Sequence, residues 1–256
     1  MRPLVFLCLL LSLGGCLSSG PQQQVTQVNY AARYPANGPE GYILVANGSG
    51  DSGTLTNHLN KAIDSTSASL AVETVNWSHG RGLSFADHVD RDNHLAQGKR
   101  LAAQVLEYSR ASNSPKIYLM GHSTGCAVIL AAAEHLPPNS VEKITLLAPS
   151  VPDTYDLRPA LMTARQGIDS YHSTKDQYIL GLGMMILGTT DPDSRSAAGL
   201  HGFRLVYSGP NDGLLYQKLR QHHWDPAVEW SGNDGGHDGS ISTGFLKAYV
   251  IPQLLK

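Results

Sequence analysis

Ser123 lies between Gly121 and Gly125, and this spacing suits a serine that acts as a nucleophile. Such a hydroxyl must project from a sharp turn and lie beside a base. The chain holds 26 glycines, so the pattern alone is weak evidence and its flanks must decide. Residues 117–120 form a short apolar run typical of a buried strand, and residues 124–133 are mostly helix formers. A strand, a sharp turn and a helix in this order favour a nucleophile over a structural turn serine.

Predicted strands and helices alternate along the rest of the chain. Further buried strands are expected at residues 41–46, 70–77 and 143–150. Amphipathic helices are expected with Leu55, Leu59 and Ile63 on one face, over residues 93–108, and over residues 156–165. This alternation predicts an α/β fold with a mainly parallel central sheet and helices on both faces. The sequence contains no internal repeat, so residues 40–256 are expected to form one domain.

This order of elements, with the turn at residues 121–125, resembles the α/β-hydrolase superfamily. In that family, a glycine-rich loop after an early strand supplies a backbone amide to the oxyanion hole, and the letters NGSGDSG at residues 47–53 occupy the matching place. The resemblance implies Ser49 as this donor, with Gly48 as the neighbouring alternative. The amide of Thr124, at the start of the helix, is expected to be the second donor. Phosphate binding by the loop is disfavoured because the lysine of a phosphate-binding loop is missing.

The general base of such an enzyme is a histidine near the C-terminus, and His237 fits best among 11 histidines. It lies in the glycine-rich run SGNDGGHDGS, between an expected short strand at residues 227–230 and a final helix. The alternative is an ordinary surface histidine. His222 and His223 resemble a helix end, and His122 is expected to be oriented by the turn rather than to act as the base.

Two aspartates are candidates for the acid that orients the base. Asp176 follows the strand-like letters GIDSYHS, and Asp212 follows the more apolar letters FRLVYS. Strand starts about 25 residues apart favour Asp176, whereas Asp212 would make residues 151–201 an inserted cap. The letters around Asp176 also resemble a subset of bacterial hydrolases in which the first of these two acids orients the catalytic histidine. Either carboxylate would fix the imidazole tautomer and stabilise the imidazolium ion.

The first residues resemble a bacterial lipoprotein signal peptide. Arg2 precedes an apolar run over residues 4–13, which is too short to span a bilayer, and the letters LGGC end at Cys16. This resemblance implies cleavage after residue 15, lipidation of Cys16, a polar tether over residues 16–39 and, from Leu17, an outer-membrane location in the bacterial cell envelope. The alternatives are a plain secretory signal and an uncleaved anchor. Cys126 would then be the only thiol left, and core packing is its expected role.

The net charge and the spacing of histidines and aspartates argue against nucleic-acid binding and against a metal site. The formal net charge is −2 and no block of basic residues occurs, so nucleic acid is not an expected partner. His79, His88 and His94 lie among Asp87, Asp90 and Asp92, but their spacing matches no zinc pattern. We therefore expect no metal site and no cofactor, and a helix cap at Asp92 or Asn93 instead.

Together these patterns predict a lipid-anchored serine hydrolase that cleaves small-molecule or lipid carboxylic esters, like an esterase or lipase. Ser123, His237 and Asp176 would be its catalytic residues. A catalytically silent hydrolase fold that serves as an envelope-binding lipoprotein is the alternative. The apolar residues 179–188 could line an acyl pocket or form a lid, although a buried core helix is the simpler interpretation.

Overall fold

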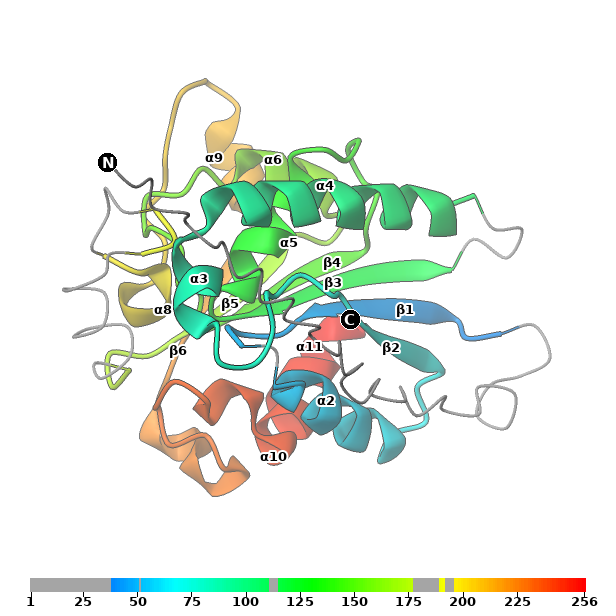
Figure 1. Cartoon of the computed structure of the whole chain (residues 1–256), viewed down its shortest axis with the longest axis vertical. Coiled ribbons are helices and arrows are strands. Elements are labelled where there is room, and N and C mark those ends of the chain that lie inside the picture. The colour runs from blue at the N-terminus through cyan, green and yellow to red at the C-terminus, as the bar shows by residue number, and fades with distance from the viewer. Residues whose placement is uncertain (1–37, 51, 111–114, 177–188, 192–195) are drawn as a thin grey trace, which may run out of the picture.

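A six-stranded parallel sheet forms the centre of the protein in the computed structural model, which describes residues 38–50, 52–110, 115–176, 189–191 and 196–256 (Figure 1). The strand order is β2-β1-β3-β4-β5-β6, and all five pairings are parallel. The strands are β1 (Gly41–Ala46), β2 (Leu70–Thr74), β3 (Lys116–His122), β4 (Lys143–Leu147), β5 (Ile168–His172) and β6 (Leu219–His223). The predicted α/β class and parallel sheet are confirmed.

Helices cover both faces of this sheet (Figure 1). One face carries α3 (Ser84–Val89), α4 (Arg91–Tyr108), α5 (Gly125–Ala133) and α6 (Arg158–Thr163), with the short α8 (Ala198–His201) and α9 (Asp212–Tyr216) nearby. The other face carries α2 (Thr54–Asp64) and the C-terminal turns η2 (Pro226–Ser231), η3 (Gly239–Ile241), α10 (Thr243–Phe245), η4 (Leu246–Val250) and α11 (Ile251–Leu254).

Two hydrophobic cores result from the alternation of side chains along the strands. Leu44 of β1 packs with α4 and α5, whereas Ile43 and Val45 point to the opposite core beneath α2 and the C-terminal helices. All nine residues of α5 are buried, because this helix is enclosed between the sheet and α4. The helix that follows Ser123 is therefore rigidly packed.

The chain reverses its direction of winding between β1 and β3. From β1 it passes to β2 at the edge of the sheet, and from β3 it passes to β4 on the other side. The loops after β1 and β3 thus diverge to opposite faces, since α2 follows β1 and α5 follows β3 (Figure 1). In parallel sheets such a switch point opens a crevice at the carboxyl ends of the strands. Ser123 and residues 47–50 lie there.

Several local predictions are corrected by the structure. Residues 227–230 belong to the 3-10 helix η2, which Pro226 begins and the Asp225 side chain caps, rather than to a strand. His222 and His223 lie in the edge strand β6, whose letters LRQHH lack an apolar pattern because the strand is only half-buried. The first turn of α4 is capped by Asp90, two and three positions before the expected caps Asp92 and Asn93.

Candidate active site

Ser123 occupies a strained turn between β3 and α5. Its φ angle of 53° lies in the left-handed region, which a residue with a side chain adopts only when its surroundings enforce it. The backbone N–H of Ser123 donates to the Leu147 carbonyl (3.0 Å), which continues the pairing of β3 with β4. The predicted sharp turn is therefore present.

The two glycines of the motif are required by close backbone contacts. A Cβ atom at Gly121 would lie 2.9 Å from the Cα atom of Cys126, and one at Gly125 would lie 2.3 Å from the carbonyl oxygen of Ala46. Both distances are well below van der Waals contact. The absence of side chains therefore allows α5 to start directly over β1 and β3.

Ser123, His237 and Asp176 lie in one hydrogen-bonded chain. The distance from Ser123 Oγ to His237 Nε2 is 2.8 Å, and the distance from His237 Nδ1 to Asp176 Oδ2 is 2.6 Å. The Asp176 side chain is 2% exposed and the His237 side chain 14% exposed. The carboxylate can only accept, so it holds a proton on Nδ1 and leaves Nε2 free to accept the Ser123 proton.

Asp176 reaches His237 because β5 lies inside the sheet, between β4 and β6. The other candidate acid, Asp212, lies at the start of α9 and accepts from the backbone N–H groups of Ser208 (2.6 Å) and Gly209 (2.9 Å) and from Arg158 (3.3 Å). Residues 203–207, which precede it, form no strand. The structure thus brings Asp176, and not Asp212, to His237.

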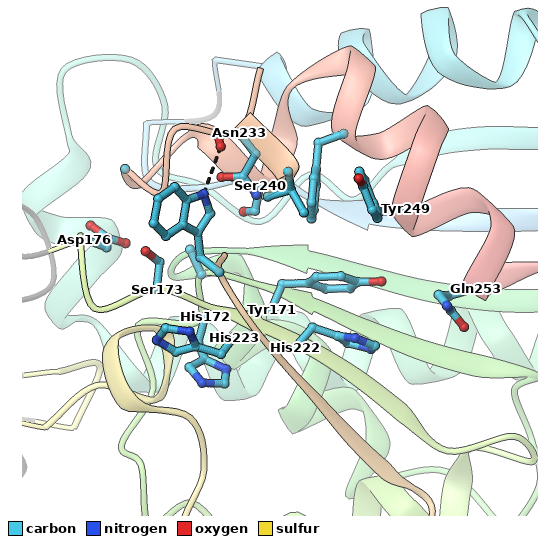
Figure 2. Close-up of a pocket in the computed structure, with 15 residues that line it drawn as sticks. Tyr171, His172, Ser173, Asp176, His222, His223, Asn233, Ser240, Tyr249 and Gln253 are labelled. Carbon is cyan, nitrogen blue, oxygen red and sulfur yellow. Dashed lines mark hydrogen bonds between the residues drawn. The ribbon is translucent and has the colours of Figure 1, made fainter. Parts of the chain in front are cut away.

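Trp224, which sequence analysis overlooked, connects the segments that carry the acid and the histidine. Its indole Nε1 donates to the Asn233 carbonyl (2.9 Å), within the loop that leads to His237 (Figure 2). Its ring also lies under the ammonium group of Lys175, 4.0 Å from the ring centroid. Because Lys175 immediately precedes Asp176, this stacked pair fixes the two loops relative to each other.

His122 lies beside His237 without entering the hydrogen-bonded chain. The two ring centroids are 5.0 Å apart, and His122 Nε2 donates to the His237 carbonyl oxygen (3.2 Å). Burial, and secondarily the nearby His237, lowers the pKa of His122 to about 3. His122 is therefore neutral at neutral pH and adds no positive charge next to an imidazolium ion on His237.

The glycine-rich loop after β1 lies against the turn that carries Ser123. A Cβ atom at Gly48 would lie 3.4 Å from the Ser123 Cβ atom, so the Gly48 backbone is next to the nucleophile. The hydroxyls of Ser49 and Thr124 are 2.5 Å apart and join this loop to the start of α5. The two residues predicted as oxyanion donors are therefore neighbours, at the serine.

Asp87 anchors the same loop from the other side. This fully buried carboxylate accepts from the Gly50 N–H (2.6 Å), the Ser78 hydroxyl (2.6 Å) and the His79 N–H (2.7 Å) and ring Nδ1 (2.9 Å). Burial raises the pKa of Asp87, but these hydrogen bonds outweigh burial and lower it below its usual range. Among the described residues, no three or more His, Cys, Asp or Glu side chains are grouped so that they could hold a metal ion. The polar segment around Asp87 instead positions the glycine-rich loop through Gly50.

A cavity of about 200 Å³ lies between β5, β6 and the C-terminal helices, with Asp176 at one end (Figure 2). Four aromatic side chains contribute to its walls, those of Tyr171, Trp224, Phe245 and Tyr249. Neither Ser123 nor His237 is among the described residues that line it. The cavity thus lies behind the acid rather than in front of the serine hydroxyl.

Cys126 is fully buried in the first turn of α5, and burial raises the pKa of its thiol, as expected for a packing residue. The signal peptide, Cys16 and most of the predicted tether, as well as the apolar residues 179–188, lie outside the described residues. Among the helices that the structure does describe, none has the length and apolar character needed to cross a membrane.

Comparisons with known proteins give structural similarities only. No protein family model matches the sequence, and no curated protein matches it either. The chain is similar to the catalytic core domain of acetyl xylan esterase from Trichoderma reesei, with a TM-score of 0.43 and 13% identity over 85% of this chain and 96% of that chain. It is similar to Est1E from Butyrivibrio proteoclasticus, with a TM-score of 0.44 and 13% identity over 87% and 92% of the two chains. A cutinase from Trichoderma reesei, in complex with a phosphonate inhibitor, matches with a TM-score of 0.35 and 18% identity over 44% of this chain and 53% of the cutinase.

Proposed function

We propose that this protein is a serine hydrolase of the α/β-hydrolase type that cleaves carboxylic esters through an acyl-enzyme. One observation carries this proposal, namely the continuous hydrogen-bonded chain from Asp176 through His237 to Ser123. A hydroxyl, an imidazole and a buried carboxylate in this order activate a serine for attack on an acyl carbon.

Acylation begins with attack by Ser123 Oγ on the ester carbon. The new C–O bond forms as the Ser123 proton moves to His237 Nε2, and the π electrons of the carbonyl move to its oxygen. Asp176 stabilises the imidazolium ion that results. When the tetrahedral intermediate collapses, the bond to the alcohol breaks and His237 returns the proton to the departing oxygen.

The backbone amides of Thr124 and Ser49 are the proposed donors to the oxyanion. Thr124 immediately precedes α5, where unpaired N–H groups and the helix dipole favour a negative charge. The position of Gly48 against Ser123 makes its amide the neighbouring alternative. Asp87 and the Ser49 to Thr124 contact support this site because they hold the loop in place before substrate arrives.

Deacylation repeats these steps with water as the nucleophile. His237 takes a proton from water as the oxygen of water bonds to the acyl carbon. The C–Oγ bond then breaks and the proton returns to Ser123, which restores the resting enzyme. The scheme requires a small-molecule or lipid ester as substrate and involves no cofactor.

We also propose that the mature chain begins at a lipidated Cys16 and is anchored in the bacterial cell envelope, at the outer membrane. The support is the sequence LGGC followed by Leu17, together with the polar residues that separate Cys16 from β1. A tether of this kind would hold the hydrolase domain at a membrane surface.

Hydrolysis of p-nitrophenyl esters of increasing acyl length tests the proposed reaction. We expect His237→Ala to lower kcat/KM by orders of magnitude, because Ser123 loses its base. His135→Ala, which changes an exposed histidine after α5, is the matched control and should retain full activity. Equal activity of the two variants would contradict the proposal and favour a catalytically silent, binding role for the fold.

A further inference from the structure

A second buried hydroxyl, that of Ser150 in the loop after β4, contacts the nucleophile in addition to the imidazole of His237. Ser150 Oγ lies 3.0 Å from Ser123 Oγ, and Ser150 is only 1% exposed. Nothing in the sequence motif of the turn involves Ser150, which is 27 residues further along the chain. The contact therefore depends on the tertiary fold.

The backbone holds Ser150 firmly in this position. Its N–H donates to the Ser123 carbonyl (3.2 Å), and its own carbonyl accepts from Thr190 N–H (3.1 Å). Just before it, Ala148 has a φ angle of 45°, a left-handed conformation that is unfavourable for alanine. This turn directs the chain back towards Ser123, so the structure maintains local strain where the two serines meet.

The proton positions determine which hydroxyl donates. Asp176 holds a proton on His237 Nδ1, so His237 Nε2 must accept and the single Ser123 proton is directed to it. The remaining bond between the two hydroxyls can then be made only by the Ser150 proton. Ser150 donates and Ser123 Oγ accepts.

We propose that Ser150 is a further catalytic residue, whose hydroxyl donates a hydrogen bond to Ser123 Oγ and stabilises the negative charge that develops on this oxygen. The proposal rests on the proposed serine hydrolase function. In the resting enzyme the bond joins two neutral hydroxyls. As Ser123 loses its proton to His237, the same bond becomes charge-assisted and therefore stronger.

This strengthening makes the bond catalytic rather than merely structural, because it stabilises the transition state more than the ground state. Ser150 keeps its proton throughout. During acylation it donates to Oγ as the proton leaves for His237 and the bond to the acyl carbon forms. During deacylation it donates to the same oxygen as the C–Oγ bond breaks and the electron pair returns to Oγ.

The test compares Ser150→Ala and Ser150→Thr by rapid-mixing kinetics with p-nitrophenyl acetate, which resolves the acylation burst from the slower turnover. We expect Ser150→Ala to lower both the acylation and the deacylation rate about 10- to 100-fold, with little change in substrate binding. Ser150→Thr keeps the hydroxyl and should restore most of the loss. Ser170→Ala is the matched control, because Ser170 is as buried as Ser150 and its hydroxyl has no hydrogen-bond partner among the described residues. The acylation and deacylation rates of this variant should be unchanged.

Ser150→Ala rates within threefold of the unaltered protein would overturn the inference. Equal rate losses in Ser150→Ala and Ser150→Thr would also overturn it, because loss of the hydroxyl would then not be the cause of the slower rates. A thermal unfolding curve of each variant excludes a general loss of folding as the origin of a rate change. Ser123→Ala separates this inference from the proposed function. If Ser123→Ala is inactive and Ser150→Ala is fully active, only the role of Ser150 is wrong, whereas an active Ser123→Ala variant contradicts the hydrolase itself.

Discussion

Replacement of Asp176 by asparagine is the sharpest test of how the acid acts. The side chain keeps its shape, but the charge next to His237 Nδ1 is lost and the amide can hold the imidazole in the wrong tautomer. Over the 2.6 Å between Asp176 Oδ2 and His237 Nδ1, a charge pair at an effective dielectric constant of about 20 is worth about 6 kcal/mol. This interaction exists fully only when His237 is protonated, which is in the transition state.

A loss of about 6 kcal/mol corresponds to a rate decrease of about 10⁴-fold. Since the amide retains part of the orienting hydrogen bond, we expect Asp176→Asn to lower kcat about 10³- to 10⁴-fold, with little change in KM. Asp212→Asn is the matched control, because this carboxylate contacts Arg158 and two backbone amides away from His237. Its activity should stay within threefold.

Steady-state hydrolysis of a p-nitrophenyl ester, measured at the pH optimum for all three proteins, decides the matter. The reasoning is refuted if Asp212→Asn is the impaired variant, or if Asp176→Asn retains more than about a tenth of the activity.

Three further predictions follow from the packing, the buried histidine and the N-terminal motif. In a urea titration, Gly125→Ala should lower the free energy of unfolding by at least about 2 kcal/mol, because the new Cβ would lie 2.3 Å from the Ala46 carbonyl oxygen. Gly213→Ala is the control and should not be destabilising, because the space around Gly213 is open. Because the pKa of His122 is about 3 in the folded protein, this histidine takes up a proton between pH 6.5 and 3 only in the unfolded chain. As the pH falls through this range, His122 should therefore reduce the free energy of unfolding by up to about 1.4 kcal/mol per pH unit. Urea titrations of His122→Gln over this pH range should show a shallower dependence, and an identical slope would contradict the assignment. Mass spectrometry of the mature protein should find a diacylglyceryl group on Cys16, and Cys16→Ser should move the protein from the detergent phase to the aqueous phase.

The parts of the site that depend on local chain geometry were predictable from the sequence. The turn at Ser123 is encoded by Gly121 and Gly125 together with the apolar strand before them, and both glycines are needed for backbone contacts within a few residues or with the neighbouring strand β1. The position of His237 in a glycine-rich loop near the C-terminus was predictable for a similar reason. The regular spacing of strands also favoured Asp176, because it assigns β5 to the sheet.

The parts that depend on tertiary packing were not predictable. Ser150 meets Ser123 only because β3 and β4 are adjacent and Ala148 turns the chain back, and no local pattern in the letters KITLLAPS indicates this. The role of Asp87 was likewise hidden in a polar segment that could equally be a surface connection. The edge strand β6 escaped detection because a half-buried strand of polar residues has no hydrophobic alternation.

Covalent labelling of the active-site serine is the most direct test of the proposed hydrolase. The full-length protein is treated with a fluorophosphonate probe, digested, and analysed by mass spectrometry, with Ser123→Ala as the control. We expect one phosphonylated residue, Ser123, and no labelling of the alanine variant. An unlabelled native protein, or labelling that persists in Ser123→Ala, would contradict the assignment of Ser123 as the nucleophile.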